Sequence, residues 1–276
     1  RSKEFLNSKE YIVKEENELL LFLLDVVKGQ SRNAIKGILS HRLVAVNGSP
    51  VTQFDFKLFK GDVVLISKSP LKRNNTIKLD IIYEDEEIIV INKPTKLLTV
   101  ASDKEKGKTA YRLVTDYVQI KNPRNRVFVV HRIDEDTSGV LMFAKNPKIQ
   151  SLYQDKWNDL VMIRGYYAVV DGVMKEKKKT ITSFLKSNSL NLMYSSDDKV
   201  HGKKAVTHYS VIDENEDYSL LDVNIDSGRK NQIRVHLGDL GHHIIGDDKY
   251  GNPSNPIKRL GLHAYCLKIR HPETKK

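Results

Sequence analysis

The stretch RVFVVHRIDEDTSGVLMFAK, residues 126–145, places a charged segment between two apolar runs. The runs VFVV (127–130) and VLMFA (140–144) are rich in β-branched and aromatic residues and have the length of buried strands. The segment between them holds an Arg, three consecutive acidic residues and a Thr-Ser-Gly, which are common in turns. We therefore predict two neighbouring strands whose connection carries the charged residues.

Further strand patterns occur outside this pair, and helical patterns separate only some of them. Strands are predicted within IKLDIIYEDEEIIVINKP (77–94), GYYAVVDGV (165–173), HGKKAVTHYSVI (201–212) and YSLLDVNIDSG (218–228). Helices are predicted within NPKIQSLYQDKWNDL (146–160) and RKNQIRVHLGDLG (229–241). Because strand and helix do not alternate regularly, the pattern predicts an α+β fold with a mixed, largely antiparallel sheet and flanking helices.

One apolar stripe in the first of these helices has two readings. The stripe recurs at helical spacing and consists of Ile149, Leu152, Tyr153 and Trp157. Such a stripe is more typical of a core-facing side than of a platform on which bases stack, so we predict that it is buried.

A change in composition near residues 67–78 separates a smaller N-terminal part from the rest. The segment SKSPLKRNNTIK is polar and basic, contains Pro70 and lies between apolar segments, as linkers do. We predict a small N-terminal α/β module over residues 1–70, a linker over residues 71–79 and a larger domain over residues 80–276.

The N-terminal part has the pattern of two short helices beside a small sheet. ELLLFLLDVV (18–27) and SRNAIKGILSHR (31–42) have helical periodicity, and Ser31 is placed to cap the second helix. Arg32 and Lys36 are four residues apart and share a face. A basic helical face of this kind suits structured RNA, which proteins recognise by shape and phosphate. The alternative is a helical adaptor whose basic face is merely solvated.

The charge of the chain points to a polyanionic partner. Lys and Arg number 46 against 35 Asp and Glu, a formal net charge of +11. Such an excess favours nucleic acid, because binding phosphates releases counterions, although a merely basic protein is the alternative.

Cys266 is the single cysteine, so no intrachain disulfide can form and no multi-cysteine metal site exists. The N-terminus lacks the apolar core of a signal peptide, and no apolar run approaches the ~20 residues that span a bilayer. We expect a cytoplasmic protein with no membrane partner.

Several chemistries can be weighed for the charged segment. The three acids at 134–136 are typical of a solvated turn, and a Mg²⁺ site is the minority alternative. The histidines of the C-terminal third lack the spacing of metal ligands. Ser138 is not in a nucleophile elbow, and SGRKNQIR (227–234) is not a phosphate-binding loop. What remains is an Asp beside an Arg at a strand end, where the carboxylate serves as nucleophile, general base or charge stabiliser.

The charged segment also resembles a family motif. HRIDEDTSG (131–139) resembles the H-R-L-D-x-x-T-S-G motif of the RluA-type pseudouridine synthases, which act on uridines in structured RNA. Further segments resemble the family's motifs in the same order: INKPTKLLTV (91–100), RGYYAVVDG (164–172), HGKKAVTHY (201–209), SGRKNQIRVHLGDLGHHIIGDDKYG (227–251), RLGLHAYCL (259–267) and HPET (271–274). In front, SRNAIKGILSHRLVAVNG (31–48) and the later KGD (60–62) resemble the S-four-like RNA-binding module that many members carry.

The resemblance implies roles for individual residues. Asp134 would be the catalytic aspartate, Tyr166 would stack on or shield the target base, and Arg234 would pair with Asp134. Arg132 would hold the place of the flipped-out base in the RNA. The other implied substrate-binding residues are His131, Thr137, Lys93, Arg229 and Gln232. The implied RNA contacts of the N-terminal module are Arg32, Asn33, Lys36, Arg42 and Asn47.

The resemblance further implies an isomerase that works as a monomer, without cofactor or metal, on RNA. The RNA would be large-subunit ribosomal RNA, with transfer RNA as the alternative. Uridine becomes pseudouridine only if the base detaches and rotates, so it must leave the stack. The sequence leaves open whether the Asp attacks the ribose or the base. The rival function is a non-catalytic RNA-binding or ribosome assembly factor.

This chain departs from the family's pattern at a few positions. They are Ile133, Arg164, Ser227, Asn231 and His243, where the family commonly has Leu, Lys, Thr, His and Pro. None of them is Asp134, Tyr166 or Arg234, so we expect the departures to bear on the choice of target more than on activity. Of the three acids, Glu135 and Asp136 are expected to be turn residues, while Arg132 and Asp134 face a cleft.

Overall fold

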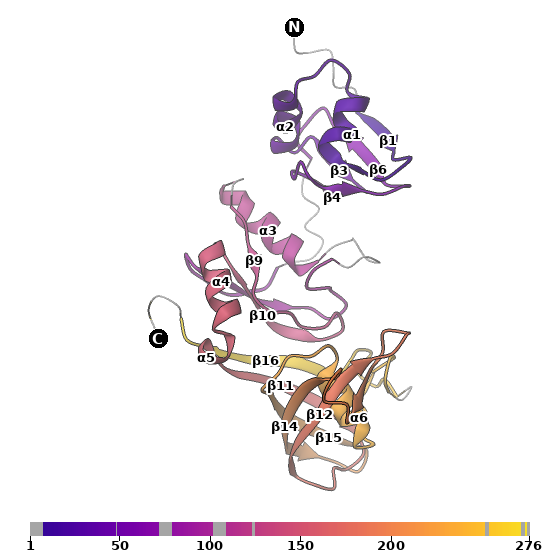
Figure 1. The fold of residues 1–276 in the computed structure, drawn as a ribbon, viewed down its shortest axis with the longest axis vertical. Helices are drawn as coiled ribbons and strands as arrows, with labels where there is room; N and C mark the ends of the chain where they lie inside the picture. Colours follow the sequence, from indigo (N-terminus) through magenta and orange to yellow (C-terminus); the bar gives the residue numbers. More distant parts are fainter. Residues whose placement is uncertain are drawn as a thin grey trace. The chain divides into compact units, whose positions relative to one another are not determined.

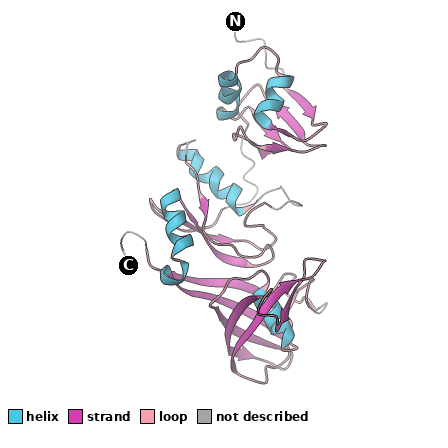
Figure 2. Cartoon of the chain, viewed as in Figure 1, coloured by secondary structure: helices cyan, strands magenta, loops and turns pink. Residues whose placement is uncertain are grey.

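A computed structural model describes residues 8–47, 49–71, 79–101, 109–122, 125–251, 254–271 and 274 (Figures 1 and 2). The chain divides into two compact units, Arg1–Lys78 and Leu79–Lys276. This division falls within the predicted linker, of which residues 72–78 lie outside the described part. Within the described residues, no helix is long and apolar enough to cross a membrane.

The N-terminal unit contains the two predicted helices and a small sheet. Its elements are β1 (Lys9–Ile12), β2 (Asn17–Glu18), α1 (Leu19–Val26), α2 (Arg32–Ser40), β3 (Val44–Val46), β4 (Ser49–Pro50), β5 (Lys57–Leu58) and β6 (Val63–Ile66). The order β1-β6-β3-β4 forms one sheet, and β2 pairs with β5. As predicted, the hydroxyl of Ser31 caps α2 by accepting a hydrogen bond from the Ala34 N–H at 3.2 Å. The apolar sides of both helices pack on the sheet and leave Arg32 and Lys36 exposed.

The larger unit is built on one long mixed sheet. Its strands are β7 (Ile81–Glu84), β8 (Ile88–Lys93), β9 (Phe128–Val129), β10 (Ser138–Ala144), β11 (Val161–Asp171), β12 (Lys178–Ser187), β13 (Met193–Ser196), β14 (Lys203–Glu214), β15 (Tyr218–Ile225) and β16 (Leu262–Ile269). They run in the order β13-β12-β14-β15-β11-β16-β10-β8-β7, with β9 beside β10. Among these described strands, only β10 and β16 pair in parallel. The predicted α+β class with a largely antiparallel sheet is confirmed.

Helices cover this sheet in two places. They are α3 (Ala110–Lys121), α4 (Pro147–Asp155), the single turn α5 (Trp157–Leu160) and α6 (Gln232–Asp239). Ile149 and Tyr153 of α4 are buried against β8 and β10, and Ile233 and Leu237 of α6 are buried against β11 and β15. Of the predicted apolar stripe, Trp157 is only partly buried and Leu152 likewise, so the stripe is core at its centre alone.

The parallel pairing of β10 with β16 positions the charged segment. Ser138 and Gly139 of β10 pair with His263 and Ala264 of β16. Gly139 has a φ of 114°, and a Cβ at this position would lie 2.0 Å from the Ala264 carbonyl oxygen. Only glycine therefore fits, which explains the Gly of the Thr-Ser-Gly turn. This pairing brings the 131–137 loop next to β16 and its neighbour β11.

Candidate active site

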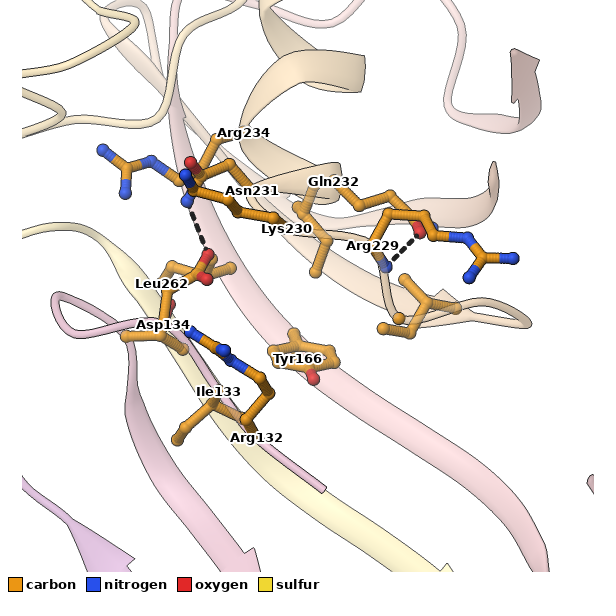
Figure 3. Close-up of a pocket in the computed structure, with 14 residues that line it drawn as sticks. Arg132, Ile133, Asp134, Tyr166, Arg229, Lys230, Asn231, Gln232, Arg234 and Leu262 are labelled. Carbon is orange, nitrogen blue, oxygen red and sulfur yellow. Dashed lines mark hydrogen bonds between the residues drawn. The ribbon is translucent and has the colours of Figure 1, made fainter. Parts of the chain in front are cut away.

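A pocket of about 170 Å³ lies between the 131–137 loop and the start of α6. Arg132 and Asp134 line it from the loop, Tyr166 lines it from β11, and the 228–234 segment closes the opposite side (Figure 3). Arg132 is exposed and Asp134 is partly exposed, so both side chains are accessible from solvent. The expectation that Arg132 and Asp134 face a cleft is therefore confirmed.

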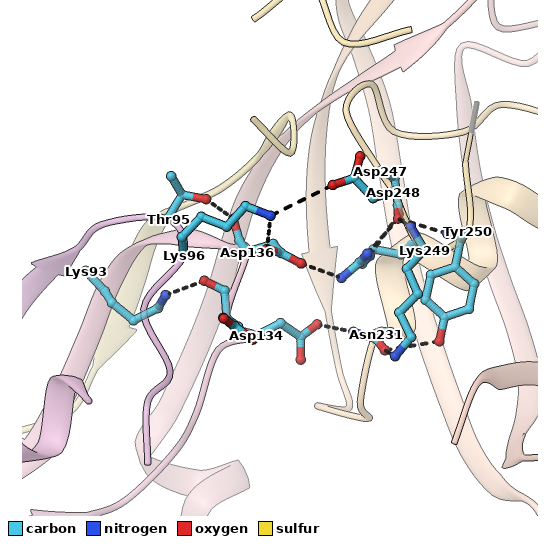
Figure 4. A network of polar contacts seen from close by, with 12 residues as sticks. Lys93, Thr95, Lys96, Asp134, Asp136, Asn231, Asp247, Asp248, Lys249 and Tyr250 are labelled. Atoms are coloured by element: carbon cyan, nitrogen blue, oxygen red, sulfur yellow. Dashed lines mark hydrogen bonds and ion pairs between the residues drawn. The ribbon is translucent and has the colours of Figure 1, made fainter. Parts of the chain in front are cut away.

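The carboxylate of Asp134 is held by Asn231. The Asn231 amide Nδ2 donates to Asp134 Oδ2 at 2.8 Å. Its Oδ1 accepts from Lys249 Nζ at 3.2 Å and from the Tyr250 hydroxyl at 3.0 Å (Figure 4). Because both of these partners are donors, the amide oxygen must face them and the NH₂ group must face Asp134.

The backbone conformation of Asn231 allows its side chain to reach Asp134. Asn231 occupies the N-cap position of α6 in the left-handed region, with φ 53° and ψ 22°, and its side chain makes no cap hydrogen bond. Asn tolerates this conformation better than most residues. In the sequence, Asn231 stands out only as a departure from the family's pattern, because a left-handed N-cap leaves no signal that would reveal the contact.

We expect Asn231→Gly to lower kcat roughly ten- to hundredfold, the effect of losing a hydrogen bond to a charged group. Glycine keeps the left-handed backbone and removes only the amide. RNA affinity should stay unchanged, because Asn231 acts through Asp134. The measurement is the rate of the uridine isomerisation that the family resemblance implies, as a function of RNA concentration. Asn191→Gly is the matched control, since Asn191 has a φ of 59°, is exposed and does not line the pocket. Equal rates for the two variants would contradict the positioning role.

The predicted pairing of Arg234 with Asp134 is wrong. Arg234 Nε and Nη2 donate to the two carboxylate oxygens of Asp247 at 2.8 and 2.6 Å. The remaining nitrogen, Nη1, lies 3.6 Å from Asp136 Oδ2. The physical reason is that Asp247 is as buried as Arg234, with side chains 1% and 3% exposed, and matches both arms of the guanidinium fork. Arg234 does line the pocket beside Asp134.

Burial and pairing act in opposite directions on this ion pair. Burial favours the neutral form of Arg234, but the hydrogen bonds and charge of Asp247 outweigh it and raise the pKa of Arg234. Burial likewise opposes ionisation of Asp247, yet Arg234 and two backbone N–H groups lower its pKa overall. Both groups are therefore charged at neutral pH.

Asp136 is not the solvated turn residue that the sequence suggested. Its Oδ1 lies 2.9 Å from Lys96 Nζ, and its Oδ2 faces Arg234. Asp136 thus links the turn after β8 to α6 (Figure 4). Glu135 is exposed, as expected of a turn residue.

The predicted substrate contact of Lys93 is also wrong. Its side chain is fully buried, and Nζ donates to the carbonyl oxygens of Pro94, Leu97 and Glu135 at 3.0, 2.6 and 3.0 Å. All three ammonium hydrogens are used, so none is left for RNA. Burial lowers the pKa of Lys93 to about 8, while the negative charge of Asp134 acts in the opposite direction. Lys93 instead ties the Lys-Pro turn to the loop that carries Asp134.

Gln232 and Asn47 are likewise occupied by contacts within the protein. Gln232 Nε2 donates to the Val206 carbonyl and the Thr207 hydroxyl, and its Oε1 accepts from Ser227 Oγ and the Arg229 N–H. In the N-terminal unit, Asn47 bonds Asp62 Oδ1 and the Val63 N–H, both at 2.9 Å. These contacts replace the predicted substrate contact of Gln232 and RNA contact of Asn47, because a side-chain amide with its groups paired has little left to offer.

The remaining predicted residues lie at the pocket or on the module surface. Tyr166 presents its ring to the pocket, and burial raises its pKa to about 12, so it is neutral (Figure 3). Thr137 is buried and lines the pocket, while Arg229 is exposed at the rim. In the N-terminal unit, Asn33 is exposed, and Arg42 is partly exposed with a φ of 56°.

His131 lies next to the pocket but is bonded on one side. Its Nε2 accepts from the Met142 N–H at 3.0 Å, so this nitrogen carries no proton and Nδ1 carries the hydrogen. Burial lowers the pKa of His131 to about 4, with a smaller contribution from the charge of Arg164. The ring packs 5.4 Å from the ring of Trp157. His131 is therefore a neutral residue that braces the loop.

We expect His131 to make stability fall as the solution is acidified. The folded state binds the proton more weakly than the unfolded state, whose pKa is the ordinary 6.5. The free energy of unfolding is therefore unaffected above pH 6.5 and decreases between pH 6.5 and about 4. The expected loss is about 1–3 kcal/mol.

The comparison with His131→Gln isolates this effect, because the Gln carbonyl can still accept the Met142 N–H and does not titrate. Urea unfolding followed by Trp157 fluorescence at several pH values gives the free energies. The stability difference between wild type and variant should move in favour of the variant as the pH falls. A difference that is constant from pH 7 to pH 4 would contradict the assignment.

No group of three or more His, Cys, Asp or Glu side chains that could hold a metal ion is found in the described part of the chain. Ser138 is buried and its hydroxyl contacts His263 Nδ1 and Arg259 Nη2 at 2.7 and 2.5 Å. Ser138 therefore supports the pairing of β10 with β16 and does not line the pocket.

Comparison with known proteins connects this geometry to a family. The family model of the RNA pseudouridylate synthases matches residues 87–239, which include the 131–137 loop, Tyr166 and all of α6. YhcT of Bacillus subtilis, an uncharacterized RNA pseudouridine synthase, is 32% identical over 95% of this chain and 88% of its own length. The ribosomal large subunit pseudouridine synthase D of Haemophilus ducreyi is 29% identical over 92% of this chain and 85% of its own length.

A solved structure shows the same fold. Human RNA pseudouridylate synthase domain-containing protein 1 matches with a TM-score of 0.57 over 73% of this chain and 82% of its own, at 24% identity. This likeness bears on the fold alone. The matching family model and the relatives in sequence confirm the resemblance to the pseudouridine synthases and favour an enzyme over a binding-only factor. The chain belongs to the RNA pseudouridylate synthase family and is an isomerase that acts on RNA.

Proposed function

We propose that this protein converts specific uridines of structured RNA to pseudouridine, with Asp134 acting on a uridine that has been flipped out of its stack. The observation that carries the proposal is the Asp134 carboxylate, held by Asn231 at the wall of a pocket that also contains the Tyr166 ring. The pocket is of the order of a base in size and lies within a loop-lined recess, which a stacked base in a duplex does not reach.

The chemistry needs one carboxylate and a confined base. The bond between ribose C1′ and N1 breaks, the base rotates, and a bond from C1′ to C5 forms. The C5 proton then leaves to solvent, and N1, which no longer carries the ribose, takes up a proton from solvent. Asp134 attacks either C1′ or the base, and in both cases it is released in the last step, so atoms and charge balance. The neutral Tyr166 ring offers stacking, which is worth about 1–3 kcal/mol for a base on an aromatic side chain.

The proposed target is large-subunit ribosomal RNA, with transfer RNA as the second candidate. Support comes from similarity to relatives named ribosomal large subunit pseudouridine synthase D. The proposed site of action is the cytoplasm, where the enzyme works as a monomer without metal or cofactor. Mapping pseudouridines in cellular RNA with and without the protein tests the target, because each true site should lose its modification when the protein is absent.

Tritium release tests the reaction itself. RNA labelled with tritium at C5 of uridine should release its label into water when incubated with the protein, because C5 loses its hydrogen only when the new bond forms. Binding of the same RNA without any release over many hours would contradict the proposed reaction and leave a binding function.

We further propose that the N-terminal unit is an S-four-like module that anchors the RNA through α2. Arg32 and Lys36 are exposed on one side of this helix, and Lys36 Nζ lies 4.6 Å from the centre of the Phe54 ring. The double variant Arg32→Met, Lys36→Met should weaken RNA binding about tenfold or more at physiological salt, because each lost phosphate contact also removes counterion release.

The salt dependence of that binding provides a second readout. The slope of log affinity against log salt should decrease by about one to two units in the double variant. Tritium release at saturating RNA should be unchanged, since α2 belongs to a separate unit. Lys9→Met, Lys14→Met is a control of equal charge on exposed positions of the same unit. If this control and the α2 variant behave alike, the specific role of α2 is contradicted.

A further inference from the structure

A second groove, of about 400 Å³, adjoins the active-site pocket. It shares Arg132, Tyr166 and Arg229 with the pocket and continues to Trp157 and Arg164. In Figure 3, Arg132 and Arg229 lie on opposite sides of the Tyr166 ring. A strand of RNA with one nucleotide in the pocket would thus have this groove beside it.

Arg164 is an unusual residue for a groove wall. It lies on β11 two residues before Tyr166, is partly buried, and burial lowers its pKa. Within the described residues its guanidinium forms no ion pair. Burying a charge without a partner is costly, so such a site is poised to accept an anion.

The position of the guanidinium is defined by a glycine. A Cβ at Gly228 would lie 2.9 Å from Arg164 Nη1, so the absence of a side chain at Gly228 leaves the room that Arg164 occupies. Gly228 lines both the pocket and the groove. The positive charge of Arg164 therefore lies close to the boundary between the two, with exposed Arg229 next along the loop.

The acidic residue of this groove, Asp226, acts on Arg164 through its charge but forms no ion pair with it among the described residues. Asp226 has a side chain that is 60% exposed, and its Oδ2 contacts His208 Nε2 at 3.0 Å. The lining of the groove contains one carboxylate, that of Asp226, and three arginines, Arg132, Arg164 and Arg229. The groove is therefore positive where it meets the pocket.

Trp157 supplies an aromatic surface at the other side. It is partly buried, its ring is 5.4 Å from His131, and the Arg164 guanidinium lies 5.8 Å from the ring centre. Grooves that combine arginines with aromatic rings bind the backbone and the bases of single strands. The sequence alone favoured a core role for Trp157, and the structure gives it a surface in the groove as well.

We infer that this groove binds the nucleotide next to the target uridine, with its phosphate at Arg164 and Arg229 and its base against Trp157. This inference rests on the proposed function, because it takes the pocket to hold the target uridine. Phosphate at Arg164 supplies the missing counter-charge, and arginine presents several N–H donors to phosphate oxygens. The flanking nucleotide then helps to hold the strand in the orientation that the flipped uridine needs.

Trp157 is the single tryptophan of the chain, so a change in tryptophan fluorescence when a ligand binds the folded protein reports on the groove. Titration of the full-length protein with a single-stranded hexamer of uridines should change this fluorescence, whereas uridine monophosphate, which fills only the pocket, should change it far less. Arg164→Met should weaken hexamer binding, measured by this signal, roughly tenfold or more. Arg164→Lys, which keeps the charge, should retain most of the affinity.

Lys175→Met is the matched control. Lys175 is exposed in the loop after β11, and it is roughly 20 Å or more along the strand direction from Arg164. If Arg164→Met binds the hexamer as the control does, or if the hexamer leaves Trp157 fluorescence unchanged, the inference is overturned. With structured RNA as substrate, Arg164→Met should raise KM about tenfold and change kcat less.

The two proposals fail in different ways. Tritium release by the wild type together with an unchanged KM in Arg164→Met would overturn the groove and leave the proposed reaction intact. Arg164-dependent hexamer binding without any tritium release would contradict the reaction and show that the groove binds RNA for another purpose. Trp157→Leu, compared with Trp157→Phe, tests the base contact, since only the leucine variant should raise KM, by about fivefold or more.

Discussion

Asp134→Asn is expected to reduce tritium release by about four orders of magnitude, the scale on which enzymes lose activity when an essential carboxylate is replaced. Asn keeps the size of the side chain but cannot act as a nucleophile or carry the negative charge. RNA affinity should be retained, since Arg132, Tyr166 and the N-terminal unit are unchanged. The measurement is single-turnover release from C5-labelled RNA at saturating enzyme, so that binding does not limit the rate.

Glu135→Gln is the matched control for this substitution. It removes the adjacent carboxylate by the same isosteric change, and its side chain is exposed. It should keep nearly full activity, because its contribution to the site is the carbonyl that accepts from Lys93. A rate for Asp134→Asn within tenfold of that of Glu135→Gln would overturn the assignment of Asp134 as the catalytic residue.

The strands and three of the residues that line the pocket could be predicted from the sequence, because their signals are local. The apolar runs around 131–137 have the period and composition of strands, and β9 and β10 do pair there. Arg132, Asp134 and Tyr166 follow the motifs closely, and the structure places all three in one pocket. The Thr-Ser-Gly segment predicts a turn at Gly139, and the close approach of this residue to the Ala264 carbonyl gives the physical reason for a glycine there.

The partners of the polar residues could not be predicted, because they depend on which segments the fold brings together. The sequence predicts that Lys93 is free to bind substrate, yet the loop that carries Glu135 returns to it, and the Glu135 carbonyl accepts a hydrogen bond from its Nζ. Asp134 and Asn231 are far apart in sequence and meet only because β10, β16 and β11 lie side by side. Charge and motif predict that a residue belongs to a site, but not which of several acids or carbonyls it contacts.

The same distinction applies to Arg234, whose pairing partner was mistaken. Asp134, Asp136 and Asp247 all carry a charge that attracts Arg234. Burial lowers the pKa of Arg234, and each of these three charges raises it. The buried Asp247 takes the bidentate position, and Asp136 takes the remaining nitrogen. Arg234 thus supports the wall of the pocket that it lines, and its removal should affect stability as well as activity.

Arg234→Met is therefore expected to destabilise the larger unit by about 3–5 kcal/mol, because it leaves the charge of Asp247 buried without a partner. Asp247→Leu should cost a similar amount, since it leaves the buried guanidinium with only its longer contact to Asp136. Arg234→Lys should not restore stability, because an ammonium cannot engage both carboxylate oxygens as the planar fork does. Urea unfolding followed by Trp157 fluorescence measures these free energies in the full chain, since this single tryptophan belongs to the larger unit.

The double variant Arg234→Met, Asp247→Leu separates the cost of an unpaired charge from the cost of lost packing. If the single variants are unstable mainly because each leaves one buried charge, then removing both charges should recover a large part of the loss, and the double variant should be more stable than either single variant. Activity should not recover with stability, because Asp136 would lose its Arg234 contact and the turn that carries Asp134 would lose that support. Free energies that simply add in the double variant would show that the pair is not coupled, and would remove Arg234 and Asp247 as the buried support of this active site.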